Sequence, residues 1–298
     1  MEDKISNYDK KKYKIYYTPY HIIDLILKLF PVTDDDNILD CCCGDGRILK
    51  TIKKNHPNVY CKGIDIHKDT ITYNQRENIY NINYEQDDFL KKKNNPIYSY
   101  SIINPPYGLK NKKTELHFVH KLLQNIKSNG KCICIIPQSV LFKNDKTTIE
   151  YKKLILDNNT LDGVITLNPN TFGEVGARVC LTIFTANTPH DYNNMVKFIN
   201  FEDDGYVLRK HKGLIPTEYV TERRTYLQKV YDDKLNAPND FLIKSKITVT
   251  DEWLHSFYYY NNRPPSHEMF EETMNDYLKF QFNAIMNNKE EVLWEKIL

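Results

Sequence analysis

The stretch from residue 37 to residue 46 reads Asn-Ile-Leu-Asp-Cys-Cys-Cys-Gly-Asp-Gly, and it indicates the fold class. Its apolar run predicts a buried strand, Gly44 and Gly46 predict a tight turn, and the spacing of residues 47–55 predicts a helix. Glycine lets the backbone turn sharply and approach a ligand, and the helix that follows offers free N–H groups. The turn is therefore a candidate ligand site, although Gly-x-Gly alone is as often purely structural.

Strands and helices alternate around this stretch until about residue 190. The pattern predicts strands at 59–66, 97–103, 131–136, 163–167, 179–184 and 196–201, and helices at 19–30, 68–79, 115–128 and 148–157. Thr18 is expected to cap the first helix, with Pro19 at its first helical position. Such alternation predicts an α/β fold with a mostly parallel sheet.

The chain becomes polar and aromatic beyond this point, with helical patterns at 216–235 and 267–285. We expect one domain over residues 1–205 and a small, helical C-terminal appendage over 206–298. The run Phe257-Tyr-Tyr-Tyr260 in the appendage suits packing or a partner interface better than nucleic acid.

Composition excludes several classes of protein. The chain has 298 residues, a formal net charge of +2 and seven cysteines. It is long enough for a real core, and it has no apolar run of the ~18 residues that a membrane span requires. Its charged N-terminus lacks an apolar signal segment, so we expect a reducing, cytoplasmic location. The three consecutive cysteines cannot converge on one zinc ion, so we expect no metal and a packing role for the thiols.

Two further acidic segments come after the glycine turn in the sequence. Asp65 ends the predicted strand 59–66, and an acid at that place can accept both hydroxyls of a ribose. Its alternative role is at the start of the next helix. The triplet Asp87-Asp88-Phe89 could set a carboxylate beside an adenine amino group, or be an ordinary acidic loop.

The most informative motif is Asn104-Pro105-Pro106-Tyr107, directly after an apolar strand. Two prolines fix the backbone and remove N–H donors, so that carbonyl groups are left to accept hydrogen bonds. The Asn104 side chain and the Pro105 carbonyl could hold one –NH2 group, while Tyr107 stacks on a flat ring. The ends of the strands are where open α/β sheets bind ligands, so these motifs are expected to meet.

With these motifs the chain resembles the adenine-N6 DNA methyltransferases of the gamma arrangement (TaqI-like), and it is similar to the methylation subunits of type I restriction-modification systems. The resemblance spans roughly residues 13–205 and implies a Rossmann-like fold with a seven-stranded sheet that binds S-adenosylmethionine. It implies cofactor contacts from four segments, with these residues: Tyr17, Thr18 and Pro19; Asp40, Cys41, Gly44 and Gly46; Asp65 and Ile66; Asp87, Asp88 and Phe89. It also implies that Asn104, Pro105, Pro106 and Tyr107 are catalytic and that Phe172 contacts the target base.

The same resemblance implies a partner and a substrate. Double-stranded DNA would bind with one adenine flipped into the pocket. Lys110, beside Lys112 and Lys113, could contact a phosphate or belong to a solvated loop. Fewer than a hundred residues follow the catalytic fold, so either recognition is minimal or a separate specificity or restriction subunit supplies it.

Other functions remain open at this level. A grip of this kind also suits ribosomal RNA adenine or a protein glutamine amide, while the Thr18-Pro19 segment and the run Pro137-Gln-Ser-Val-Leu141 favour DNA. A non-catalytic subunit that binds DNA or a restriction partner is an alternative of another class.

Overall fold

The structure is a computed structural model, and it describes residues 16–108, 114–173, 177–261 and 267–286. Lys110, a candidate phosphate contact, lies outside the described residues. Contacts divide the chain into two compact units, the first ending at Tyr258 and the second beginning at Tyr259. The sheet and the predicted site residues belong to the first unit.

Within the described residues, nine strands form one sheet in the order β11-β8-β6-β7-β5-β4-β1-β2-β3. Strands β1 to β4, β5, β6 and β8 run in one direction, whereas β7 and β11 pair antiparallel to their neighbours. The bounds are β1 (Asn37–Asp40), β2 (Tyr60–Asp65), β3 (Ile82–Gln86), β4 (Tyr98–Ile103), β5 (Ile126–Pro137), β6 (Thr160–Thr166), β7 (Val179–Thr185), β8 (Val196–Asn200) and β11 (Leu242–Ser245). The predicted α/β class with a mostly parallel sheet is confirmed.

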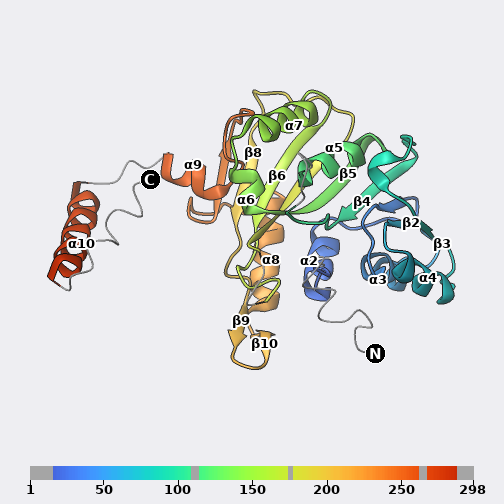
Figure 1. The fold of residues 1–298 in the computed structure, drawn as a ribbon, viewed down its shortest axis with the longest axis horizontal. Coiled ribbons are helices and arrows are strands. Elements are labelled where there is room, and N and C mark those ends of the chain that lie inside the picture. The colour runs from blue at the N-terminus through green and yellow to red at the C-terminus, as the bar shows by residue number, and fades with distance from the viewer. Residues whose placement is uncertain (1–15, 109–113, 174–176, 262–266, 287–298) are drawn as a thin grey trace. The chain divides into compact units, whose positions relative to one another are not determined.

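The seven strands β1 to β7 stand in the order β3-β2-β1-β4-β5-β7-β6, and β8 and β11 extend this sheet at one edge. The central strands are buried on both faces, as expected for parallel strands covered by helices. The helices are α2 (Tyr20–Leu29), α3 (Arg47–Asn55), α4 (Lys68–Arg76), α5 (Glu115–Leu123), α6 (Gln138–Phe142), α7 (Lys146–Leu156), α8 (Val220–Tyr231) and α9 (His255–Asn261). Helices α5 and α7 pack together on one face, and α2 packs with α3 and α8 on the other (Figure 1).

Several local predictions needed correction. Helix α2 begins at Tyr20, with Pro19 at its N-cap and no side-chain cap, so Thr18 does not cap it. Instead the Pro19 carbonyl accepts the N–H groups of Ile22 and Ile23. The predicted helix 115–128 ends at Leu123, because Ile126 already begins the long strand β5 beside β4.

Strands β3, β9 (Tyr206–Arg209), β10 (Gly213–Pro216) and β11 were not predicted. These strands are short and partly polar, so their sequence gives little alternation. The predicted helices at 216–235 and 267–285 are confirmed by α8 and, in the second unit, by α10 (His267–Met286).

The sheet continues beyond residue 205, because β11 pairs with β8 through Leu242 and Ile199. The domain boundary at 205 remains a prediction. No helix of the described residues is both long enough and apolar enough to cross a membrane.

Candidate functional site

A pocket of about 330 Å³ lies at the carboxyl ends of β1, β2, β3 and β4. Segments that follow these four strands line it, together with the segment before α2 and parts of α3 and α5. The sequence-predicted residues in its lining are Tyr17, Thr18, Cys41, Gly44, Asp65, Ile66, Asp87, Asp88, Phe89, Asn104, Pro105 and Pro106. Parallel strands bring their carboxyl ends to one edge, which is why motifs far apart in the chain meet here.

Asp65 holds the glycine turn by accepting two backbone hydrogen bonds. Its Oδ2 accepts the N–H of Gly44 at 2.9 Å, and its Oδ1 accepts the N–H of His67 at 2.9 Å. Gly44 and Gly46 have φ angles of +50° and +74°. A Cβ atom on Gly46 would stand 2.3 Å from the hydroxyl oxygen of Tyr84, so this turn needs glycine for both its conformation and its space.

Asp40 lies behind this turn and outside the pocket lining. Its side chain is fully buried, Oδ1 accepts the N–H of Cys42 at 3.2 Å, and Oδ2 finds no hydrogen-bond partner among the described residues. Burial raises the pKa of Asp40 to about 8, the Cys42 N–H opposes this rise, and the nearby Asp65 and Asp45 add to it. At neutral pH the Asp40 carboxyl group is therefore mostly protonated.

The cysteines pack around the same turn. Burial raises the pKa of the Cys41 and Cys43 thiols, and the hydrogen bond with Cys41 raises that of Cys42. Thiols of this kind stay protonated and are poor nucleophiles. Cys41, Cys42 and Cys43 thus line the pocket as small, neutral side chains.

Arg47, which the sequence reasoning missed, ties the segment before α2 to the glycine turn. Its guanidinium makes a bidentate ion pair with Asp45 and lies 4.6 Å from the ring centre of Tyr17 and 5.2 Å from that of Tyr20. It also donates to the Thr18 carbonyl at 3.4 Å. Its position directly after Gly46, in the first turn of α3, was the available signal.

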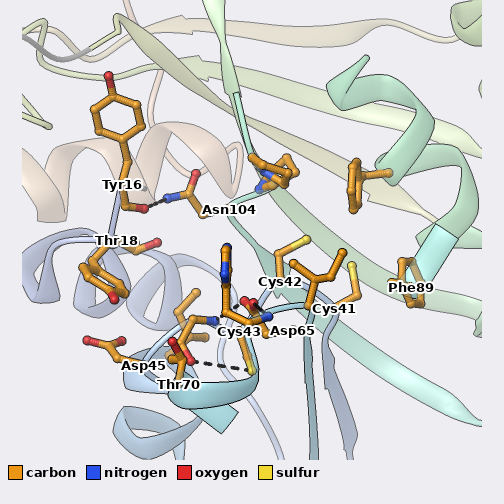
Figure 2. Close-up of a pocket in the computed structure, with 18 of the residues that line it drawn as sticks. Tyr16, Thr18, Cys41, Cys42, Cys43, Asp45, Asp65, Thr70, Phe89 and Asn104 are labelled. Carbon is orange, nitrogen blue, oxygen red and sulfur yellow. Dashed lines mark hydrogen bonds between the residues drawn. The ribbon is translucent and has the colours of Figure 1, made fainter. Parts of the chain in front are cut away.

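The Asp87-Asp88-Phe89 segment forms the wall of the pocket beyond β3. The Asp87 N–H donates to the Asp65 carbonyl at 3.0 Å, and Asp88 caps a short helical turn over Phe89–Lys91 by accepting the Leu90 N–H. A hydrogen bond from Lys92 lowers the pKa of Asp87. Phe89 is buried and forms the apolar part of this wall, across the pocket from Tyr16 in the view of Figure 2.

The amide of Asn104 has a fixed orientation. Its Nδ2 donates to the main-chain carbonyl of Tyr16 at 2.7 Å (Figure 2). Its Oδ1 accepts the hydroxyl of Tyr107 at 2.5 Å. One N–H of the amide thus sets its orientation, and Oδ1, which has two lone pairs, can accept one hydrogen bond besides that from Tyr107. The loop that follows Tyr107 is also held in place, because the Gly108 N–H donates to the side chain of the buried Glu115 at 2.8 Å.

Three aromatic rings from distant parts of the chain gather beside Asn104. Tyr16 stacks on Tyr107 with ring centres 5.5 Å apart, and Phe172 meets Tyr16 at 5.7 Å and Tyr107 at 6.2 Å, edge to face. Tyr107 is 8% exposed and does not line the pocket, and neither does Phe172. Stacking of Tyr107 on a ligand therefore requires the Tyr16 ring to move.

Pro19, Asp40 and Gly46 support the pocket from outside its lining. The lining residues that were not predicted are Tyr16, Cys42, Cys43, Asp45, Arg47, Ile48, His67, Thr70, Leu90 and Phe118. Most of them are chain neighbours of predicted residues, whereas Phe118 comes from α5 and gave no sequence signal. In the described part of the chain, no cluster of three or more His, Cys, Asp or Glu side chains could hold a metal ion.

Comparison with known proteins yields one matching family and many similar folds. The sequence model of a family described as N-6 DNA methylase matches residues 2–263. The "Type II restriction enzyme and methyltransferase RM.BcgI" of Heyndrickxia coagulans is 36% identical over 305 residues, which cover 92% of this chain and 47% of that protein. The chain thus spans about half the length of this curated relative.

Solved structures show the same fold at low sequence identity. The type I restriction-modification methyltransferase subunit from Streptococcus thermophilus matches with a TM-score of 0.63 and 19% identity, over 78% of this chain and 56% of that chain. The M protein of the type I restriction enzyme EcoKI matches with a TM-score of 0.58 and 14% identity, over 72% of this chain and 53% of that chain. A candidate class I S-adenosylmethionine-dependent methyltransferase from Listeria monocytogenes matches with a TM-score of 0.57 and 16% identity, over 72% of this chain and 71% of that chain.

Proposed function

Because this chain belongs to the N-6 DNA methylase family, we propose that it transfers a methyl group to the N6 amino group of an adenine in double-stranded DNA, within a restriction-modification system. The pocket accounts for both halves of such a reaction. One part suits a nucleoside-bearing methyl donor, and the other suits a flat ring with an exocyclic amine.

The residues present fit S-adenosylmethionine, which supplies the methyl group when bound. The glycine turn brings its backbone to the pocket, Asp65 lines the pocket beside this turn and would accept ribose hydroxyls, and Phe89 would form an apolar wall for a purine. Cys41 and Asp88 would contribute the remaining contacts nearby, and Thr18 would close the pocket from the segment before α2. The pocket volume is within the range typical of small-ligand sites.

At the other part, Asn104 and Pro105 would hold the adenine amino group. Oδ1 of Asn104 and the carbonyl of Pro105 would accept its two hydrogens, which directs the nitrogen lone pair away from the ring plane. Fixed carbonyl dipoles also stabilise positive charge that develops on nitrogen. Much of the rate gain would come from holding the two reactants in line.

The observation that carries this proposal is the oriented amide of Asn104. One N–H of its amide donates to the Tyr16 carbonyl, and Oδ1, which already accepts the Tyr107 hydroxyl, has a second lone pair for a hydrogen of the target amine. The ring of Tyr16 lines the pocket beside this amide and packs against Tyr107 and Phe172. Tyr107 would stack on a base that has left the duplex once the Tyr16 ring moves aside.

The test is methyl transfer from labelled S-adenosylmethionine to DNA, RNA and a protein extract, with parent chain, Asn104→Ala and the matched surface variant Asn55→Ala. We expect label in DNA, a loss of about 10² to 10³-fold in Asn104→Ala, and parental activity in Asn55→Ala. Cofactor binding by calorimetry should survive in all three proteins. Parental methylation by Asn104→Ala would contradict the assignment.

The same assay separates the alternatives. Label in RNA or in protein instead of DNA would favour a ribosomal RNA adenine methyltransferase or a protein-glutamine methyltransferase. Cofactor binding with no turnover on any substrate would favour a non-catalytic subunit. One solved structure similar to this chain concerns complex assembly of a type I restriction-modification system, with a TM-score of 0.60 and 14% identity. Assembly with a specificity or restriction subunit is therefore part of the proposal for this chain.

A further inference from the structure

The hairpin of β9 and β10 forms a two-stranded sheet of its own and projects from the body of the first unit (Figure 1). Its pairs run from Tyr206–Pro216 at the base to Arg209–Gly213 near the tip. The tip reads Arg209-Lys210-His211-Lys212, and residues 206–216 contain no acidic side chain. In a chain with a net charge of +2, three full positive charges thus stand within four residues.

The tip is exposed and its cations are not used internally. Residues 207–213 are all exposed, and within the described residues no ion pair involves Arg209, Lys210 or Lys212. Val207 and Leu208 are also 37% and 39% exposed, so the arms of the ribbon are not buried in the core. A solitary hairpin is only marginally stable in water, so this one depends on how its base is held.

The base of the hairpin is held rigidly. Gly205 has a φ angle of +82°, and a Cβ atom there would stand 2.7 Å from the backbone nitrogen of Val220 in α8. Thr217 closes the neck, its N–H and hydroxyl both donating to the Gly205 carbonyl, at 2.9 and 2.7 Å. The ribbon therefore leaves the body in a defined direction.

The hairpin and the Asn-Pro-Pro-Tyr motif both follow the carboxyl ends of their strands, and these ends lie on the same side of the sheet. The hairpin follows β8, which runs in the same direction as β6 and β4. The carboxyl ends of β8 and β4 therefore lie on the same side of the sheet. At the base, Tyr206 stacks on His21 of α2 with ring centres 4.6 Å apart. Arg224 covers Tyr206 at 5.5 Å and donates to the His21 carbonyl at 2.8 Å.

A second connection joins the hairpin to the aromatic rings beside Asn104. The buried Asn168 donates to Asp204 at 2.8 Å and to the Tyr206 carbonyl at 3.2 Å. Its own carbonyl accepts the Thr171 hydroxyl at 2.7 Å, immediately before Phe172. The loop that presents Phe172 and the base of the hairpin are thus one hydrogen-bonded assembly.

From this placement we infer that the β9–β10 hairpin binds the DNA duplex beside the target adenine, with Arg209, Lys210 and Lys212 on backbone phosphates. This inference rests on the proposed function. A strand of four residues spans ~13 Å, which exceeds the ~8.5 Å depth of a major groove that is wide enough for a two-stranded ribbon. Contacts of this kind position the duplex without reading its sequence.

The experiment measures binding of the full chain, with S-adenosylmethionine present, to two short duplexes of unrelated sequence across a salt series. The hairpin variant carries Arg209→Gln, Lys210→Gln and Lys212→Gln. The matched control carries Lys54→Gln, Lys127→Gln and Lys229→Gln, three exposed lysines at the last turns of α3 and α8 and the start of β5. Calorimetric cofactor binding verifies that each variant is folded.

Three phosphate contacts correspond to a salt slope of about 2.7, so the advantage of the parent over the hairpin variant should shrink about 40-fold between ~50 and ~200 mM salt. The loss should be equal on both duplexes, and the control variant should behave as the parent. Equal affinity and slope for hairpin variant and parent would overturn the inference and leave the proposed function intact, and would point to a protein partner on this ribbon. A parent chain that neither binds nor methylates duplex DNA would instead overturn the proposed function and this inference with it.

Discussion

Replacing Asp40 by asparagine should make the protein more stable, and by an amount that increases with pH. In the folded state burial raises the pKa of Asp40 from 3.8 to about 8, whereas the unfolded chain ionises this group near its ordinary value. Between these two values the folded protein holds one proton more than the unfolded chain. Rising pH therefore favours unfolding over this window, because the unfolded state is the one that ionises.

The magnitude follows from the width of the window. One proton corresponds to about 1.4 kcal/mol per pH unit, so Asp40 lowers the free energy of unfolding by up to about 4 kcal/mol at pH 7 relative to pH 4. Asparagine has the same shape, can accept the Cys42 N–H, and does not ionise. The stability difference between Asp40→Asn and the parent should thus grow by about 2 to 3 kcal/mol from pH 5 to pH 7.

The assay is urea unfolding of parent and Asp40→Asn at pH 5, 6 and 7 in constant salt, in the absence of cofactor. Taking the difference between the two proteins removes the contribution of all other titrating groups. Asp35→Asn, in which an exposed carboxylate is removed, supplies the baseline. A stability difference for Asp40→Asn that is flat across this range, or that falls with pH, would refute the reasoning.

Three further substitutions test other parts of the site. Gly46→Ala should lower the free energy of unfolding by at least about 1 kcal/mol more than Gly213→Ala, since both have a positive φ angle but only the first would clash, and urea midpoints measure this. Arg47→Ala should weaken S-adenosylmethionine binding about tenfold in calorimetry by releasing the segment before α2, equivalent to ~1.4 kcal/mol; unchanged affinity would show that Arg47 does not organise the pocket. Tyr107→Phe removes one hydrogen bond to Asn104 and should slow methyl transfer about fivefold with cofactor affinity retained, and a parental rate would argue that this bond does not orient the amide.

Local sequence was sufficient for those parts of the site that depend on strand ends. Gly44 and Asn104 follow predicted strands and Asp65 is the last residue of one, and parallel strands bring such positions to one edge. The same logic failed for β3 and for the hairpin of β9 and β10, because short strands with little alternation carry a weak signal. The helical spacing also predicted that α5 ends at residue 128 instead of Leu123, because the pairing of β5 with β4 begins at Ile126 and overrides that spacing.

The α/β class and the glycine turn could be predicted from the residues in order along the chain, because they depend on periodicity and on backbone freedom within a few residues. The folded structure was needed to see that the carbonyl of Tyr16 orients the amide of Asn104, 88 positions away, and that the ring of Tyr16 covers Tyr107. It alone connected Asp204 at the base of the hairpin to Asn168, 36 positions earlier. Contacts of such separation arise from the packing of whole elements, which no local pattern of residues encodes.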